Sequence, residues 1–307
     1  MTDANLPELN RLDWLDALRG WAVLGVVMVH SGQAARSAGT AQQISAAGQY
    51  GVQLFFFISA LTISITYEAH TVKFGKSFRA QISWFIKRFF RIAPLYYIAI
   101  IFYTLERYEI YLLSHNKYGQ APNILNIVAN ILFIHTWIPS ANNSVVPGGW
   151  SIGVEMCFYV LVPFIWFLSP LKARISWLAV SAILFLTVTA AVARMMTGRF
   201  YVFDDTYFYY WFPTQAPVMI VGLIFYFLGG LKLQRSKNTT HIARWFALFL
   251  AGTGVAIYFG TGFAVLPFVS PTIFALSFVC LIISLHGYVK KIIVNKIMIF
   301  LGKLSFS

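Results

Sequence analysis

The sequence predicts an all-α integral membrane protein, a polytopic helical bundle with about nine spans, and three observations support this. Of the 307 residues, 59% are hydrophobic and 18% aromatic, and only 11% are charged, whereas about a quarter are charged in soluble globular proteins. Apolar runs of the length that crosses a bilayer, about 17–25 residues, recur along the whole chain. The 23 Lys and Arg residues outnumber the 10 Asp and Glu residues, an excess that in such a chain indicates topology signals and not nucleic-acid binding.

Eight apolar runs qualify or nearly qualify as spans: 15–31, 51–68, 94–113, 150–168, 175–194, 211–231, 245–259 and 263–285. A ninth begins near residue 297 and is cut short at residue 307, so we expect the chain to lack its C-terminal end. The N-terminal segment has no basic region or cleavage site typical of a secretory signal, so the first run is expected to remain as a span. No internal repeat or linker is visible, which predicts a single membrane domain over residues 1–307.

The segment 124–138 is ambiguous because it is short and contains Asn126, Asn130 and His135. If it does not cross and the N-terminus is cytoplasmic, 17 basic residues lie inside and 5 outside; if it crosses, the split becomes 10 against 12. Since cytoplasmic loops carry the excess of Lys and Arg, we predict that this segment is re-entrant or lies at the outer interface. Such backbone is tolerated at membrane depth only against protein or a wet cavity.

The first run contains Arg19 and His30, which are eleven residues apart. In a helix this separation is a net rotation of about 20° and about 16 Å along the axis, so both project from one face. Ionisable residues within a span are costly and are functional candidates by default. The alternative is that Arg19 is a snorkelling anchor and His30 an interfacial cap.

The stretch KRFFRIAPLYY places Arg88 and Arg91 three residues apart, on one helical face at the predicted cytoplasmic side. Paired guanidinium groups suit bidentate binding of phosphate. The alternative is a positive-inside anchor, supported by the neighbouring Lys87.

The stretch GGWSIGVEMCFY opens a span at the predicted outer side. Ser151, Glu155 and Tyr159 follow one another at intervals of four and therefore line one stripe. A carboxylate in hydrocarbon becomes neutral or finds a partner, and a His or Arg from another helix is the natural candidate. A purely structural Glu–Arg pair is the other interpretation.

Smaller polar signals are Gln53 in the aromatic run GVQLFFFISA and Gln215 in FPTQAP, where it could bond freed carbonyls or a substrate hydroxyl. The remaining histidines, including His135, fall at predicted span ends or in loops and are interpreted as interfacial. Cys157 and Cys280 lie in apolar runs, so neither a disulfide framework nor a metal site is predicted.

Taken together, these stretches resemble acyltransferase family three, the integral-membrane O-acyltransferases of bacterial surface polysaccharides and related acceptors. The resemblance covers nearly the whole chain and rests on five stretches in order: LDALRGWAVLGVVMVH, GVQLFFFISA, KRFFRIAPLYY, VVPGGWSIGVEMCFY and LGKLSFS. The first matches the family's basic residue and histidine at Arg19 and His30, and the third matches its arginine pair at Arg88 and Arg91. Where many members have Asp in the second stretch, this chain has Gln53, so Glu155 becomes the stronger candidate to orient the histidine.

The resemblance implies a multi-pass protein of the bacterial inner membrane with ten spans when complete and a cytoplasmic N-terminus. It implies acyl-CoA, in particular acetyl-CoA, as co-substrate, with no permanently bound cofactor, and a lipid-linked or surface glycan as acceptor. In that interpretation His30 is a general base or acyl relay, Glu155 orients it, and Arg19, Arg88 and Arg91 hold the donor. Trp150, Ser151, Tyr159, Gln53 and Gln215 are supporting or substrate-binding candidates. Acylation of a lipid or secondary metabolite, or a membrane transporter, remain the alternatives.

Overall fold

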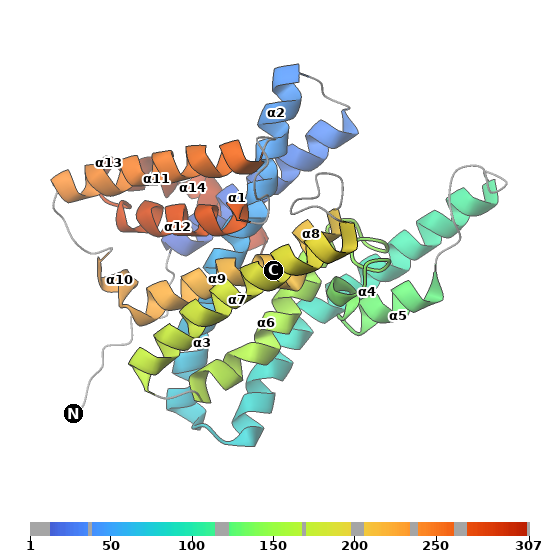
Figure 1. The fold of residues 1–307 in the computed structure, drawn as a ribbon, viewed down its shortest axis with the longest axis horizontal. Coiled ribbons are helices and arrows are strands. Elements are labelled where there is room, and N and C mark those ends of the chain that lie inside the picture. Colours follow the sequence, from blue (N-terminus) through green and yellow to red (C-terminus); the bar gives the residue numbers. More distant parts are fainter. Residues whose placement is uncertain are drawn as a thin grey trace. The chain divides into compact units, whose positions relative to one another are not determined.

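The computed structural model describes residues 13–35, 39–113, 123–167, 170–197, 206–233, 239–260 and 269–305. Within these ranges the chain forms helices and no strands (Figure 1). An all-α architecture is therefore confirmed for the described part of the chain.

Four described helical stretches are long and apolar enough to cross a membrane: Gly48–Phe74, Trp150–Phe167, Leu171–Val192 and Tyr207–Phe227. They contain α3 (Gly51–Phe74), α6 (Trp150–Phe167), most of α7 (Leu171–Thr197), and α8 (Thr206–Tyr210) with α9 (Phe212–Phe227). These helices coincide with the predicted spans because long uninterrupted apolar runs specify both the helix and its burial in lipid. The other predicted spans stay predictions.

Further helices lie where other runs were predicted: α1 (Asp13–Ala34), α11 (Thr239–Gly260), α12 (Ser270–Ile283) and α14 (Lys296–Leu304). Residues 263–268 of the predicted eighth span, and Phe306 and Ser307 of LGKLSFS, lie outside the described residues. The shorter elements are α2 (Gly39–Ala47), η1 (Gly48–Tyr50), α10 (Gly230–Leu233) and α13 (Gly287–Ile293).

The third predicted span, 94–113, lies in the second half of a longer helix. α4 is one helix from Phe78 to Leu113 with Pro94 inside it. Proline removes a backbone donor and usually ends or kinks a helix, and three basic residues interrupt the apolar run before it. Arg88 and Arg91 therefore lie within a long helix and not at its start.

The segment 124–138 does not form a spanning helix. It contains α5 (Ile124–Ile131) and the short 3₁₀ helix η2 (His135–Trp137), separated by a turn in which Phe133 has a φ of 58°. At 1.5 Å per residue, an eight-residue helix such as α5 is about 12 Å long, less than half of the ~30 Å hydrocarbon core. These short helices agree with the prediction that the segment does not cross, and that stays a prediction.

The direction of α4 and α6, the helices that flank this segment, agrees with that prediction. The Tyr96 hydroxyl of α4 lies beside Gly149 at the start of α6. The Trp84 ring, twelve residues earlier in α4, lies against Tyr159 further along α6. The two helices are therefore antiparallel, and α6 begins beside the middle of α4.

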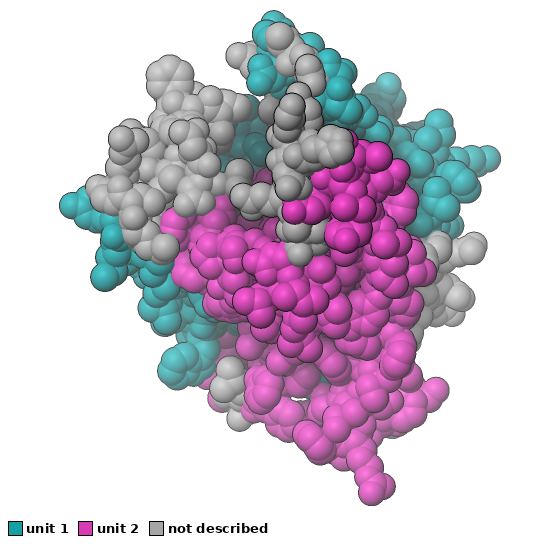
Figure 2. Space-filling view, turned by 90° about the vertical axis from the view of Figure 1, so that its right-hand side faces the viewer, with its two compact units in different colours: residues 1–69, 175–203, 217–307 teal, residues 70–174, 204–216 magenta. Residues whose placement is uncertain are grey.

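The chain divides into two compact units, shown in different colours in Figure 2. Unit 1 comprises residues 1–69, 175–203 and 217–307, and unit 2 comprises residues 70–174 and 204–216. The last boundary falls at Pro217 within α9. The prediction of a single domain stays a prediction.

Unit 1 is held together by close backbone contacts at glycines. A Cβ on Gly20 of α1 would collide with the backbone of Met298 in α14, and a Cβ on Gly302 of α14 would collide with the backbone of Asp16. Gly51 at the start of α3 meets the carbonyl of Ala22 in the same way. Small residues let membrane helices approach closely where van der Waals packing supplies the attraction.

Candidate functional site

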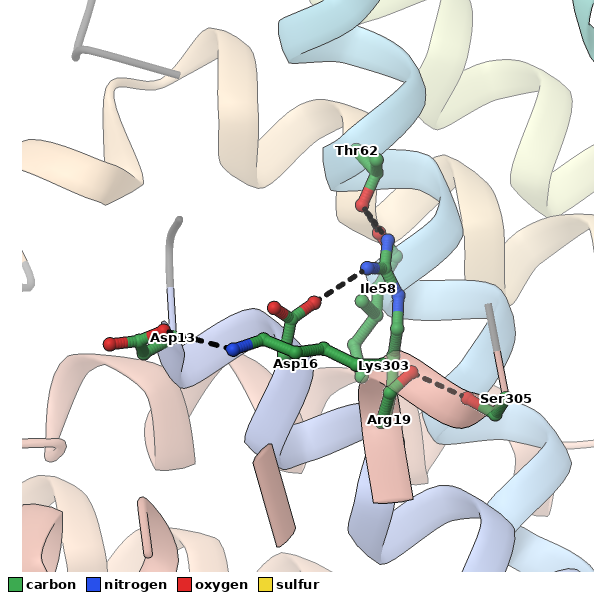
Figure 3. Close-up of polar contacts among 8 residues, drawn as sticks. Asp13, Asp16, Arg19, Ile58, Thr62, Lys303 and Ser305 are labelled. Atoms are coloured by element: carbon green, nitrogen blue, oxygen red, sulfur yellow. Dashed lines mark hydrogen bonds and ion pairs between the residues drawn. The ribbon is translucent and has the colours of Figure 1, made fainter. Parts of the chain in front are cut away.

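Arg19 is buried in unit 1, with only 5% of its surface exposed (Figure 3). Its Nη1 donates to Asp16 Oδ1 at 3.1 Å, one turn earlier in α1, and its Nη2 donates to Thr62 Oγ1 of α3 at 2.7 Å. Thr62 in turn donates to the carbonyl of Ile58. A buried guanidinium needs such partners, and here they connect α1 to α3.

His30 lies eleven residues further along the same helix but is exposed, near the C-terminal end of α1. The buried residues of α1 all lie between Trp14 and Ala22, because α14 packs against that half of the helix through Gly20 and Gly302. Arg19 and His30 thus share a helix and a face but differ in burial: the arginine is enclosed by neighbours and the histidine is accessible.

Gln53 belongs to the same unit and is fully buried in α3. It lies in the first turn of the helix, two residues after Gly51, which meets α1. The first, second and last of the five family-like stretches are therefore gathered in unit 1.

Unit 2 gathers the third and fourth stretches. The Tyr159 hydroxyl of α6 donates to Glu155 Oε1 at 2.5 Å, and Arg88 and Arg91 of α4 are close enough for their charges to act on that hydroxyl. The Arg88 guanidinium also lies 5.8 Å from the centre of the Trp84 ring, a cation–π contact. The structure therefore brings four predicted site residues into one cluster, which we call the arginine–glutamate cluster: Arg88, Arg91, Glu155 and Tyr159.

The prediction placed Arg88 and Arg91 at the cytoplasmic side and the start of the Glu155 helix at the outer side, and these positions in a membrane stay predictions. In the structure the two sets meet at Tyr159, midway along the eighteen residues of α6. Lys87, by contrast, is exposed and lies 5.2 Å from the centre of the Phe74 ring.

A buried polar network in unit 2 was missed by the sequence analysis. The Tyr96 hydroxyl donates to Asn130 Oδ1 at 2.6 Å and lies 3.4 Å from His135 Nε2. His135 is fully buried, and its Nε2 lies 3.0 Å from the carbonyl oxygen of Gly149. His135 is therefore buried inside the protein, which its interpretation as an interfacial residue did not predict.

The surroundings of His135 fix its protonation. Because a carbonyl oxygen can only accept, Nε2 carries the proton and donates to Gly149. Burial lowers the pKa of His135 below its ordinary value, and hydrogen bonding to the backbone offsets this only in part. A neutral His135 thus ties η2 to the start of α6. Gly153 was the one signal of this contact in the sequence. A Cβ on Gly153 would lie 2.7 Å from His135 Nε2.

The remaining supporting candidates of unit 2 have structural contacts. Trp150 is buried and stacks on Tyr210 with ring centres 4.6 Å apart. Ser151 donates to the carbonyl of Gly148. Gln215 is fully buried and its Nε2 donates to the carbonyl of Tyr209 at 2.6 Å, which is the carbonyl-bonding role that the sequence allowed for it.

His30 and Glu155 belong to different units, so their pairing stays a prediction. Among the described residues, no group of three His, Cys, Asp or Glu side chains is placed to hold a metal ion. The candidate residues therefore form two separate sets: an accessible histidine on α1 in unit 1, and two arginines of α4 with a carboxylate and a phenol of α6 in unit 2.

Comparison with known proteins gives one match. A family model described as an acyltransferase domain matches residues 12–307, which is essentially the whole chain. Neither the curated proteins nor the solved structures contain a match.

Proposed function

The chain belongs to acyltransferase family 3, and from this premise we propose that it transfers an acetyl group from cytoplasmic acetyl-CoA to a hydroxyl of a cell-envelope glycan. Its class, an acyltransferase of groups other than aminoacyl groups, follows from the family. The donor, the acceptor and the residue roles are the proposal. Its setting is the bacterial inner membrane, with the N-terminus cytoplasmic.

The observation that carries the donor assignment is the arginine–glutamate cluster. Two guanidinium groups face one carboxylate and one phenol inside an apolar helix bundle, so the cluster has an excess of positive charge. Positive charge within a span is costly unless an anion compensates it. Guanidinium groups bind phosphate bidentately, and coenzyme A carries phosphates at one end and the thioester at the other. Arg88 and Arg91 would hold the phosphates.

His30 would then act at the thioester. As a neutral general base it accepts the proton of the acceptor hydroxyl while that oxygen attacks the thioester carbonyl. The carbon–sulfur bond breaks, and the imidazolium returns the proton to the departing CoA thiolate. In the relay form of the same chemistry, the imidazole takes the acyl group first and passes it to the hydroxyl. The accessibility of His30 supports either role, because both require contact with substrate.

Glu155 is proposed to orient His30 and stabilise the imidazolium, in addition to accepting from Tyr159. Arg19 is proposed to contribute to donor binding at the cytoplasmic end, with Asp16 as its competing anion. Trp150, Ser151, Gln53 and Gln215 support the helices that carry these groups.

A direct assay separates this proposal from a transporter. Membranes containing the protein are incubated with acetyl-CoA labelled in the acetyl group, with and without a surface-glycan acceptor. The proposal expects label on the glycan, dependent on His30. Label that crosses the membrane without transfer would contradict it, and transfer to lipid alone would reject the glycan acceptor while keeping the enzyme class.

A further inference from the structure

The turn between α3 and α4 presents a surface that the proposed chemistry does not use (Figure 1). Residues 72–79, VKFGKSFR, are exposed without interruption, and the exposed fraction reaches 70% at Val72, 51% at Phe74 and 78% at Phe78. The cations of the turn are Lys73, Lys76 and Arg79. Apolar side chains mixed with basic ones are typical of segments at a membrane surface, where the apolar groups enter the acyl boundary and the charges stay at the headgroups.

The backbone of this turn is fixed by a cap at each helix end. Gly75 has a φ of 74°, and its N–H donates to the carbonyl of Thr71 at 2.9 Å, which ends α3. Ser77 Oγ accepts from the backbone N–H of Ala80 at 3.3 Å, which satisfies a donor in the first turn of α4. The side chains of residues 72–79 are therefore presented from an ordered backbone.

Two ammonium groups lie over the same ring in this surface. Lys73 Nζ is 5.3 Å and Lys87 Nζ of α4 is 5.2 Å from the centre of the Phe74 ring, and the ring is held against His70 with ring centres 4.7 Å apart. The ring face attracts both cations, but the two like charges repel each other. Neither lysine forms an ion pair with a carboxylate of the described residues, and both are exposed, so an anion from outside the protein can reach them.

The charge of the surrounding sequence narrows the class of anion. Residues 69–105 contain six Lys and Arg residues and no Asp or Glu. The predicted topology puts this turn on the cytoplasmic side, where the leaflet surface is negative and attracts basic segments. A small free anion would use the two ammonium groups but not the exposed apolar side chains beside them. A phospholipid with a net negative headgroup matches both.

We propose that Lys73, Phe74 and Lys87 form a binding site for an anionic phospholipid. The two ammonium groups bind the headgroup phosphate, since their flexible stems allow one phosphate to reach both. Val72 and Phe78 contact the acyl chains at the edge of the headgroup layer. This site goes beyond the proposed function and does not depend on it, because none of these residues holds the acyl donor or the acceptor.

Lipid titration of the detergent-purified protein tests this site, with bound lipid counted by native mass spectrometry. Wild type should bind phosphatidylglycerol more tightly than phosphatidylcholine. Lys73→Gln and Lys87→Gln should each weaken phosphatidylglycerol binding about fivefold, the contribution of one lysine beside an anionic surface, and the double variant should lose about 25-fold. The double variant Lys73→Arg/Lys87→Arg keeps both charges and should bind as wild type does. The matched control is Lys232→Gln/Lys290→Gln, which removes two exposed lysines of α10 and α13 and should also leave the affinity unchanged.

Two further measurements separate the lipid from other sources of phosphate. Acetyl-CoA affinity should be that of wild type in Lys73→Gln/Lys87→Gln, and inorganic phosphate at the concentration of the lipid should not displace phosphatidylglycerol. If acetyl-CoA binding weakens in that variant, or if phosphate displaces the lipid, the pair binds a soluble anion and the lipid site is wrong. Equal binding of the two lipids, or wild-type phosphatidylglycerol affinity in the variant, would also overturn it. If no acetyl group is ever transferred, the proposed function fails while the lipid site stands.

Discussion

The two units gather the family-like stretches by different means. In unit 1 the contacts are between backbones, at Gly20, Gly51 and Gly302, where no side chain fits. In unit 2 they are between charged and polar side chains, with Arg88 near Glu155 and Tyr159. The family-like stretches are therefore held by helix packing in unit 1 and by electrostatic contacts in unit 2. The comparison predicts that changes in unit 1 act mainly on stability and changes in unit 2 on donor binding. The proposed roles of His30 in catalysis and of Arg19 in donor binding are the exceptions.

Among the effects on binding and stability, the largest is expected at the unit 2 arginines. Arg88→Ala and Arg91→Ala should each weaken acetyl-CoA binding about 10–100-fold, since a hydrogen bond to a charged group contributes about 1.5–3 kcal/mol. Calorimetric titration of the purified protein measures this. Lys87→Ala is the control, because Lys87 contacts Phe74, and its affinity should be that of wild type. If all three variants bind acetyl-CoA with the affinity of wild type, the proposed phosphate-binding role of Arg88 and Arg91 is wrong.

Asp16→Asn tests the buried ion pair of unit 1. Losing the charge that faces Arg19 should lower the free energy of unfolding by about 1.5–3 kcal/mol, seen as a lower thermal midpoint in detergent. Because Arg19 is also proposed to contribute to donor binding, with Asp16 as its competing anion, the same variant should tighten acetyl-CoA binding. An unchanged midpoint would contradict the structural role of the ion pair. Asp13→Asn, which removes an exposed 4.0 Å contact with Lys303, should change stability by at most about 1 kcal/mol.

Gly302→Ala tests the backbone contact between α14 and α1. A methyl group directed at the Asp16 backbone should destabilise the protein by about 1–3 kcal/mol, as overpacking does. Gly254→Ala in α11 is the matched control, because a Cβ there meets nothing within 4 Å. That variant should be neutral or slightly stabilising. If the two variants have similar thermal midpoints, α14 and α1 are not tightly packed at Gly302.

The smallest effect is the pH dependence contributed by His135. Its pKa is lowered by burial, so the unfolded chain binds a proton at a higher pH than the folded protein does. Its contribution to stability is therefore complete above about pH 6.5, the ordinary value, and declines as the pH falls below it. His135→Asn removes this term, so the midpoint difference between wild type and variant should narrow at acid pH. A constant difference from pH 7.5 to 5.5 would contradict the neutral buried state.

The sequence predicts the helices well where an apolar run is long and unbroken, as in α3, α6 and α7. It did not predict the length of α4, because Pro94 and three basic residues, which ordinarily end a helix or a span, lie inside this one helix. The exclusion of 124–138 rested on the distribution of charge over the whole chain and not on local hydropathy, and the short helices α5 and η2 agree with it.

The candidate site, like the fold, could be predicted only in part. Helical periodicity places Ser151, Glu155 and Tyr159 on one stripe, but it cannot show that Arg88 and Arg91 reach that stripe. The difference in burial between Arg19 and His30 depends on α14, about 280 residues later in the chain. The Tyr96, Asn130 and His135 network joins residues 34 and 39 positions apart, a pairing that no local pattern encodes.

The most direct test of the account is the rate of acetyl transfer from labelled acetyl-CoA in His30→Ala, normalised to correctly folded protein. Gln33→Ala, at an exposed residue of the same helix, is the control. The account predicts that His30→Ala loses about 10²–10⁴-fold in rate with the thermal midpoint and acetyl-CoA affinity of wild type, whereas Gln33→Ala retains activity. Near-normal turnover in His30→Ala would contradict it.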